Sequence, residues 1–201
     1  MYKLYDFLPS GNGYKARLLL NLLDIPYKRI EVNILNRETR SPEFLAKNPN
    51  GKVPLLEIAD NRFLGESNAI LYYLSQGTKY FPTDKYARAQ VMQWLFFEQF
   101  SHEPFIATAR YWVSILKQPA EHAQQLKYKH KWGNNALKVM EQHLSNNDYL
   151  VGQSYTIADI CLYAYTHVAD EGGFDLDRYP AIVAWLDRIA AHPRHISLTE
   201  H

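Results

Sequence analysis

Asn48-Pro-Asn-Gly-Lys-Val-Pro-Leu-Leu-Glu57 and the following Gly65-Glu-Ser-Asn-Ala-Ile70 decide the interpretation of this chain. Val53-Pro54 stands directly before a short apolar run, where an X-Pro bond in a tight turn can be cis. A cis bond there turns the amide and carbonyl of Val53 outward, where they can pair with an extended peptide. Glu66 and Ser67 open a helical pattern, which brings free N–H groups, a carboxylate and a hydroxyl together. These groups suit a small peptide that carries an ammonium and a carboxylate at one end.

Length and composition indicate an ordinary globular protein. The chain has 201 residues, of which 47% are hydrophobic and 21% charged, enough for one large domain or two small ones. A net charge of +1 gives no electrostatic reason to expect nucleic acid as a partner. The first residues lack the pattern of a signal peptide, and no run approaches the ~18 apolar residues of a membrane span. We therefore expect a cytoplasmic protein with no membrane partner.

Residues 1–77 alternate between strand and helix patterns, and this predicts an α/β domain. Strands are expected over 2–7, 28–32, 55–58 and 62–64, and helices over 14–23, 42–46 and 66–76. Asp60-Asn61 is a two-residue hairpin signal between the last two strands. The order βαβαββα is that of a thioredoxin-like fold with a mixed sheet.

The pattern changes after residue 77, so we interpret 78–84 as a linker and 85–201 as a second, all-α domain. Helices are predicted over 85–101, 104–117, 121–146, 156–170 and 179–191. Thr156-Ile-Ala-Asp159 has the form of a capping box, in which Thr156 and Asp159 satisfy N–H groups at a helix start. We expect a structural role for this box.

The segments NPNGKVPLLE and GESNAILYYL resemble the N-terminal half of the glutathione transferase superfamily. The similarity continues along nearly the whole chain, through Tyr149-Leu-Val-Gly152 and the capping box. It implies a thioredoxin-like domain followed by an all-helical domain, glutathione as co-substrate, and a two-fold homodimer in the cytoplasm. The implied reaction is conjugation of the glutathione thiolate to a small apolar electrophile.

A transferase of this kind needs a thiolate at neutral pH, whereas a free thiol has a pKa of about 8.5. Ser10 stands at the end of the first strand and before the first helix, where a hydroxyl donor and a helix N-terminus can both stabilise the anion. The segment Ser10-Gly-Asn-Gly-Tyr-Lys15 resembles the serine-type classes, in which the serine donates to the sulfur. It is also similar to the nu class and to fungal prion-type relatives, in which an asparagine contacts the sulfur. Ser10 is favoured, and Asn12 stays open as the alternative.

Other thiol-activating residues fit the sequence less well. Tyr5 resembles the tyrosine of the alpha, mu and pi classes, but it lies inside the first strand, so we expect it to pack in the sheet. Other classes use a cysteine in the first loop. The sole cysteine, Cys161, sits among apolar residues in a predicted helix and is interpreted as a core residue.

The resemblance also implies the rest of the glutathione site. Lys52 corresponds to the residue that neutralises the glycyl carboxylate, and Val53, held by Pro54, to the one that pairs with the cysteinyl unit. Glu66 and Ser67 correspond to the residues that bind the γ-glutamyl ammonium and carboxylate. The second, electrophilic substrate is expected against side chains that follow the linker: Phe97, Ser101, His102, Phe105 and Tyr111.

Metal and nucleotide cofactors have no support in the sequence. The eight histidines form no HxxxH or HExxH motif, and neither a GxGxxG segment nor a P-loop is present. Two alternatives to conjugation stay open. One is a glutathione-dependent disulfide reductase or peroxidase, suggested by the Asn-Gly-x-Lys loop. The other is a binding or regulatory protein that kept the fold without the chemistry.

Overall fold

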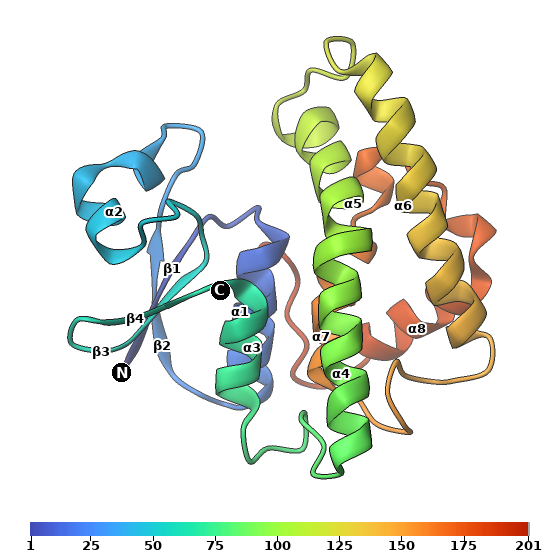
Figure 1. The fold of residues 1–201 in the computed structure, drawn as a ribbon, viewed down its shortest axis with the longest axis horizontal. Helices are drawn as coiled ribbons and strands as arrows, with labels where there is room; N and C mark the ends of the chain where they lie inside the picture. Colours follow the sequence, from blue (N-terminus) through green and yellow to red (C-terminus); the bar gives the residue numbers. More distant parts are fainter. Residues whose placement is uncertain (201) are drawn as a thin grey trace. The chain divides into compact units, whose positions relative to one another are not determined.

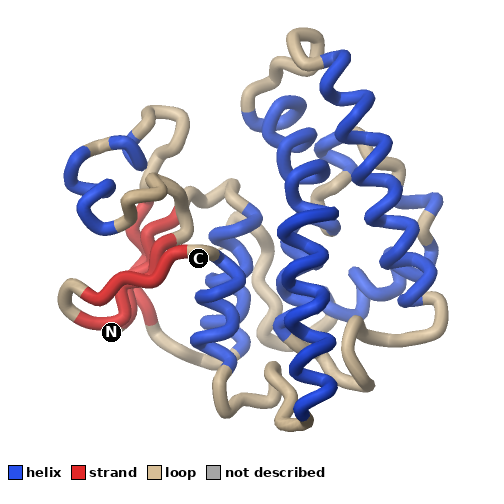
Figure 2. Tube along the Cα trace, viewed as in Figure 1, coloured by secondary structure: helices blue, strands red, loops and turns tan. Residues whose placement is uncertain are grey.

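A computed structural model describes residues 1–200 of the chain, which form two compact units. One unit contains residues 1–77 together with the C-terminal segment from Pro193, and the other contains residues 78–192. The strands all belong to the first unit, and residues 78–192 contain helices but no strand (Figure 2). The predicted fold class, a thioredoxin-like α/β domain with an all-helical domain, is confirmed.

The first unit is built on a four-stranded mixed sheet in the order β2-β1-β3-β4. Strand β1 (Tyr2–Asp6) is parallel to β2 (Tyr27–Glu31) and antiparallel to β3 (Leu55–Ala59), which pairs with β4 (Arg62–Gly65). A parallel pair needs a crossover connection, and helix α1 (Gly11–Leu22) supplies it. The Asp60-Asn61 connection between β3 and β4 is the predicted two-residue hairpin loop.

Helices α1 and α3 (Ser67–Ser75) pack side by side in the first unit (Figure 1). The leucines Leu18, Leu19 and Leu20 make α1 almost wholly buried. A buried helix of this kind holds its N-terminal residues in a fixed place. This matters because Ser10 and Asn12 lie at that end.

Helix α2 (Pro42–Lys47) follows a single 3₁₀ turn (Glu38–Arg40). Its Phe44 packs with Val32 and Leu55, and Tyr5 and Val53 contact the same cluster. The bond between Val53 and Pro54 is cis. The Val53-Pro54 turn is thus seated on an apolar cluster that fixes its position.

The C-terminal segment differs from the predicted extent of the helical domain, which was 85–201. Residues from Pro193 onward group with the first unit. The Tyr14 hydroxyl donates to the carbonyl of Ile196 at 2.6 Å, and Arg17 Nη1 donates to the carbonyls of Leu198 and Glu200 at 2.8 and 2.7 Å. These bonds to α1 attach the segment to the α/β unit.

The second unit consists of helical segments only. They are α4 (Lys85–Phe97), a π-helical turn (Glu98–His102), α5 (Glu103–Arg110), a second π-helical turn (Tyr111–Ile115), α6 (Ala123–Leu144), α7 (Ile157–Thr166), two short 3₁₀ turns (Asp170–Gly172 and Leu176–Arg178) and α8 (Pro180–Ala190). Among residues 1–200, none of the helices combines the length and apolar character that a membrane crossing requires.

The predicted break between helices 85–101 and 104–117 is wrong. Residues 85–115 form one continuous helical run, and Pro104 lies in the first turn of α5. Proline has no N–H and disrupts regular i→i−4 bonding. The wider π-helical turn just before it changes that bonding pattern, so the chain passes Pro104 without leaving the helical path.

The predicted capping box is present at the start of α7. Thr156 Oγ1 accepts from the N–H of Ala158, and Asp159 Oδ2 accepts from the N–H of Thr156 at 2.9 Å. Every residue of α7 is buried, including Cys161. The sole cysteine is thus a core residue, as the sequence predicts.

Candidate functional site

The first turn of α1 meets the first residue of α3 at one point of the first unit. Asn12 Oδ1 lies 2.8 Å from Lys15 Nζ and 3.1 Å from Ser67 Oγ. The third side is closed by Lys15 Nζ and Ser67 Oγ, which are 3.3 Å apart. We call these three residues the Asn12–Lys15–Ser67 triangle. It brings together two residues that the sequence places in the site, Asn12 and Ser67.

The electrostatics of this place favour an anion. The N-termini of α1 and α3 each present backbone N–H groups and the positive end of a helix dipole. The Lys15 side chain lies between them and is fully buried, so its charge is screened little by water. A carboxylate or a thiolate is the kind of group that such an arrangement binds.

Ser10 is the N-cap of α1. Its Oγ accepts from the N–H of Gly13 at 3.3 Å, and its backbone is extended, as is usual for a cap. A hydroxyl that accepts one hydrogen bond still carries a proton to donate. Ser10 therefore combines a structural role with the chemistry expected of a thiol-stabilising donor.

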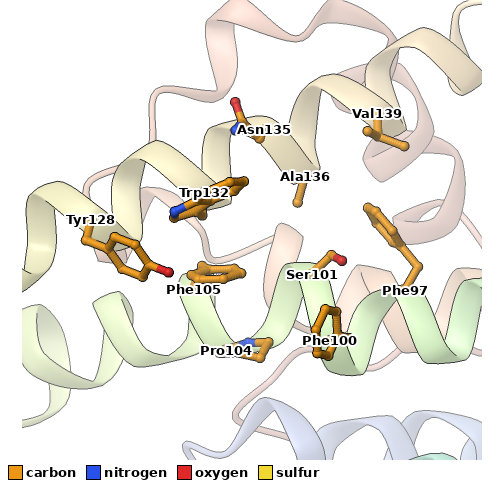
Figure 3. Close-up of a pocket in the computed structure, with 10 residues that line it drawn as sticks. All are labelled: Phe97, Phe100, Ser101, Pro104, Phe105, Tyr128, Trp132, Asn135, Ala136 and Val139. Carbon is orange, nitrogen blue, oxygen red and sulfur yellow. The ribbon is translucent and has the colours of Figure 1, made fainter.

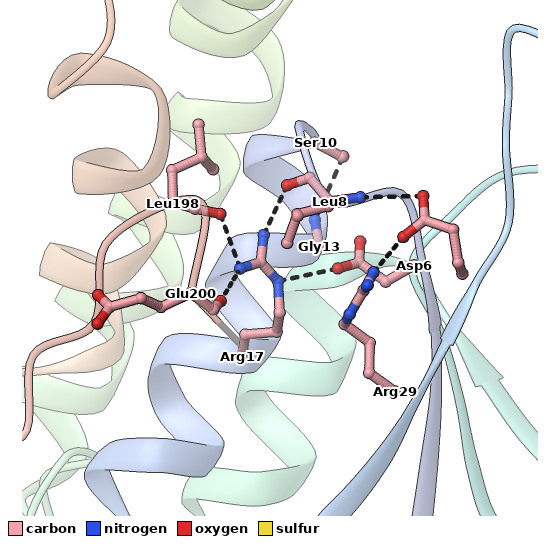
Figure 4. A network of polar contacts seen from close by, with 9 residues as sticks. Asp6, Leu8, Ser10, Gly13, Arg17, Arg29, Leu198 and Glu200 are labelled. Atoms are coloured by element: carbon pink, nitrogen blue, oxygen red, sulfur yellow. Dashed lines mark hydrogen bonds and ion pairs between the residues drawn. The ribbon is translucent and has the colours of Figure 1, made fainter.

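Gly13 allows the first turn of α1 to lie directly against a buried carboxylate. A Cβ atom at Gly13 would overlap the Asp6 side chain, so only glycine fits there. Asp6 Oδ2 is paired with Arg17 Nε at 2.9 Å, and both side chains are fully buried (Figure 4). Burial raises the pKa of Asp6 to about 6, although the Arg17 charge acts in the opposite direction.

Tyr5 lies on the face of the sheet that α2 covers. Its ring packs edge-on against Phe44 and Phe63, and its hydroxyl donates to Glu57 Oε2 at 2.9 Å. Burial and the hydrogen bond to Glu57 raise the pKa of the Tyr5 hydroxyl. The expectation that Tyr5 packs in the sheet agrees with this environment.

The Lys52–Pro54 turn presents one charged side chain beside a buried proline. Lys52 is exposed and Pro54 is buried, with Val53 half-buried between them. The carbonyl of Lys52 accepts from Asn48 Nδ2 at 2.7 Å, which ties the turn to the end of α2. A charged group with this exposure can reach a ligand carboxylate in solvent.

Glu66 precedes α3 with a backbone conformation that is rare for a residue with a side chain. Its φ is +65° and its ψ is 113°. Its exposed carboxylate accepts from Asn50 Nδ2 at 3.3 Å. Strain of this kind is maintained only where the surroundings impose it, and it concentrates at functional sites.

The second unit contains an open apolar groove of about 580 Å³ between the 85–110 helical run and α6 (Figure 3). The predicted residues Phe97, Ser101 and Phe105 line it. The remaining lining residues are Phe100, Pro104, Tyr128, Trp132, Asn135, Ala136 and Val139. The groove offers an almost purely apolar wall for a small ligand.

The other two residues predicted for that wall, His102 and Tyr111, do not line the groove. His102 is fully buried, and its Nε2 lies 2.9 Å from Thr166 Oγ1 of α7. Tyr111 opens the second π-helical turn. His102 thus has a packing role in this unit, because π-helical turns rotate the helix face away from simple 3.6-residue spacing.

Sequence reasoning missed Lys15 as a member of the site and missed α6 as a wall of the groove. Lysine is almost never fully buried, so composition alone does not indicate Lys15 as a site residue. Its spacing from Asn12 could have done so, because residues three apart are neighbours on a helix. In α6, Tyr128, Trp132 and Val139 are large and at least 41% exposed. Their spacing along the helix is the signal that could have found them.

The chain matches two family signatures. One, described as "Glutathione S-transferase, N-terminal domain", covers residues 1–76, and the other, "Glutathione S-transferase, C-terminal domain", covers residues 104–193. A crystal structure of glutathione S-transferase from Pseudomonas fluorescens Pf-5 is 53% identical in sequence, with a TM-score of 0.97 over 99% of each chain. The protein belongs to the glutathione S-transferase family.

Two further relatives carry other descriptions. The disulfide-bond oxidoreductase YfcG of Escherichia coli K12 is 30% identical over 96% of this chain and 92% of its own length. A structure of Ure2p in complex with S-hexylglutathione is 26% identical, with a TM-score of 0.87 over 99% of this chain and 98% of its own.

Proposed function

We propose that this protein binds glutathione on the first unit and transfers its thiolate to small apolar electrophiles. The observation that carries the proposal is the Asn12–Lys15–Ser67 triangle, because it joins the loop expected at the sulfur to the helix expected at the γ-glutamyl group. Its distances of 2.8 to 3.3 Å make one polar unit of the two. Glutathione is a co-substrate here, with no metal or nucleotide in the reaction.

The proposed contacts follow the charges of glutathione. Glu66 binds the ammonium of the γ-glutamyl group, and Ser67 with the α3 N–H groups binds its carboxylate. The Val53 backbone, held by Pro54, pairs with the cysteinyl unit. Lys52 neutralises the glycyl carboxylate. The exposed Glu66 and Lys52 side chains and the buried Ser67 suit a ligand that lies along the surface with one end inserted.

The proposed chemistry is nucleophilic attack by a thiolate that the ligand carries. Ser10 and Asn12 donate hydrogen bonds to the sulfur anion, which lowers the thiol pKa. The sulfur then forms a bond to an electrophilic carbon, and the leaving group departs with the electron pair of the broken bond. The thiol proton is released to solvent. The apolar groove with Phe97, Ser101 and Phe105 is the proposed place for the electrophile.

Conjugation is tested with a chlorinated dinitrobenzene and glutathione. We expect turnover, and we expect Glu66→Ala and Ser67→Ala each to raise the dissociation constant for glutathione at least tenfold. Each substitution removes a charge-assisted hydrogen bond of about 1.5–3 kcal/mol. Titration calorimetry that gives the same affinity for both variants as for the wild type would remove these residues from the site.

Disulfide reduction is the second candidate. Because Cys161 is buried in α7, a protein thiol is not available to form a mixed disulfide. Two glutathione molecules would supply the electrons: one attacks the substrate disulfide, and the second resolves the mixed disulfide to release oxidised glutathione. The relation to YfcG supports this reaction. Turnover of hydroxyethyl disulfide without arene conjugation would favour it.

A non-catalytic role, in which the protein binds glutathione without turning it over, is the third candidate; the similar structure of Ure2p holds S-hexylglutathione. Glutathione binding without arene conjugation and without hydroxyethyl disulfide reduction would favour this role.

We also propose that the protein is a homodimer in the cytoplasm. Sedimentation velocity tests the dimeric state. Phe96 is 66% exposed in the single chain, and burial of such a side chain would stabilise a second copy on the 85–110 run.

A further inference from the structure

We infer that Lys15 is a positioning residue, which fixes the orientation of the Asn12 carboxamide and strengthens it as a donor to the glutathione sulfur. This inference rests on the proposed function. Lys15 itself is not expected to touch the substrate. Its role follows from three features of the structure: its burial, its place in α1 and the two bonds that converge on Asn12.

The position of Lys15 is unfavourable for stability by itself. A cation in the first turn of a helix opposes the helix dipole, and a fully buried lysine loses its hydration. Lys15 is the fifth residue of α1, but its Nζ reaches back to Asn12 in the first turn, and the side chain is 0% exposed. Neither the burial nor the charge at the N-terminal end of α1 is expected of a residue whose role is stability alone. The cost indicates that the charge is used at this place.

The bonds of Lys15 determine which way the Asn12 carboxamide points. An amide has one end that accepts and one end that donates, and its orientation follows from its partners. Asn12 Oδ1 accepts from Lys15 Nζ at 2.8 Å and from Ser67 Oγ at 3.1 Å. Since the oxygen faces both donors, the NH₂ end is directed to the opposite side. Asn12 is therefore held as a donor rather than an acceptor.

The charge of Lys15 also changes the strength of that donor. A cation at the carbonyl end of an amide polarises it, and the N–H groups at the other end become stronger donors. A stronger donor stabilises a thiolate more than a thiol. Asp6, which lies against Gly13, and its partner Arg17 are charged groups near this turn. These two are paired with each other at 2.9 Å, whereas the Lys15 ammonium contacts Asn12 Oδ1 directly.

Ser67 extends the same coupling to the other end of the ligand. It opens α3 and donates to Asn12 Oδ1. Ser67 has one hydroxyl proton, and a γ-glutamyl carboxylate bound there would take it from Asn12. Lys15 Nζ, at 2.8 Å, would then be the donor that stays on Asn12 Oδ1. Loss of Lys15 should therefore act on the thiol pKa through Asn12, and only weakly on glutathione binding.

The experiment measures the thiol pKa of bound glutathione by its thiolate absorbance over a series of pH values, with turnover in parallel. We expect Lys15→Met to raise this pKa by about one unit, which corresponds to a tenfold loss of thiolate. The KM for glutathione should change less than threefold. Lys28 is an exposed residue of β2, so Lys28→Met is the matched control and should behave as wild type.

A double-mutant cycle with Asn12→Ala separates positioning from a direct effect. If Lys15 acts through Asn12, Lys15→Met should add nothing to the pKa change in the Asn12→Ala background. A full additional unit in the double variant would overturn the inference. An unchanged thiol pKa in folded Lys15→Met would overturn it as well. Lys15→Gln keeps a donor without the charge and should restore part of the effect.

A measurement on the unmodified protein covers the case in which Lys15→Met does not fold. The side-chain ¹H–¹⁵N resonances of Asn12 should shift when glutathione binds and should shift less with S-methylglutathione, which cannot form a thiolate. Equal shifts with both ligands would overturn the inference. The proposed function fails in a different way: wild-type protein would then not bind glutathione, or would bind it with the thiol pKa of the free peptide.

Discussion

Arg17 Nε lies 2.9 Å from Asp6 Oδ2, and neither side chain is exposed to solvent. Three further bonds from the Arg17 guanidinium go to the carbonyls of Leu8, Leu198 and Glu200 at 2.7 to 2.8 Å (Figure 4). One buried arginine thus connects β1, the loop before α1 and the C-terminal segment. The stability of this arrangement should depend on the charge of Asp6.

Asp6 gives a testable pH dependence of stability. Burial raises its pKa in the folded protein from 3.8 to about 6, so the folded state binds this proton more tightly than the unfolded state. The stability due to Asp6 is greatest below the unfolded pKa and decreases as pH rises from about 4 to about 6. Above pH 6 it is constant.

Asp6→Asn lacks this titration and is the reference. The free energy of unfolding of the wild type minus that of Asp6→Asn should decrease between pH 4 and pH 6 and then level off. The change should be at most about 3 kcal/mol, because one pKa unit corresponds to about 1.4 kcal/mol. Urea denaturation at several pH values measures it. A difference that increases with pH would mean that the Arg17 charge outweighs the burial.

Removal of the residues from Ser197 onward should destabilise the first unit. Arg17 Nη1 would lose the carbonyls of Leu198 and Glu200 as acceptors. Hydrogen bonds to a charged group contribute about 1.5–3 kcal/mol each, so we expect a loss of ~3 kcal/mol in urea denaturation. Glu200→Gln keeps the backbone carbonyl and should stay within about 0.5 kcal/mol of wild type. Equal stability of the truncated and intact chains would refute this role.

Asp159→Ala should be more damaging than a lost helix cap alone. Asp159 is fully buried, and its two oxygens accept from Leu150 N, Thr156 N, Thr156 Oγ1 and Trp185 Nε1. Alanine would leave these donors without an acceptor, each at about 1–3 kcal/mol. We expect a loss of at least ~3 kcal/mol, with a smaller loss for Asp159→Asn. A denaturation midpoint like that of wild type would show that other acceptors replace the carboxylate.

Local patterns predicted most of the fold. The capping box at Thr156, the Asp60-Asn61 hairpin and the Val53-Pro54 turn depend on neighbouring residues, and all three are present. The attachment of the C-terminal segment was not predicted. It depends on contacts between Arg17 and Leu198, 181 residues apart, for which the sequence holds no local signal.

Residue type in the sequence indicates candidate site residues, but it does not indicate residues whose role depends on burial. Ser67 and Asn12 are polar residues at helix starts, and the structure brings them together. Lys15 has the appearance of a surface residue in sequence, yet it is fully buried. His102 has the appearance of a pocket residue, yet it bonds Thr166 in the core. Only tertiary packing separates these cases.

Glu66 should show a trade-off between stability and ligand binding. Its φ of +65° costs a residue with a side chain about 1–2 kcal/mol, whereas glycine adopts this conformation freely. Glu66→Gly should therefore be at least as stable as wild type and about 1–2 kcal/mol more stable than Glu66→Ala, which keeps the strain. Thermal and urea denaturation of the three proteins measure this order.

Both variants should lose glutathione affinity to the same extent, at least tenfold, because both lack the carboxylate proposed to bind the ammonium. Calorimetric titration gives that comparison. The strained backbone at Glu66 would then lower stability while it places a carboxylate at the start of α3. If Glu66→Gly binds glutathione as the wild type does, the backbone conformation alone serves the site. If Glu66→Gly is less stable than Glu66→Ala, the positive φ carries no strain and this explanation of Glu66 is wrong.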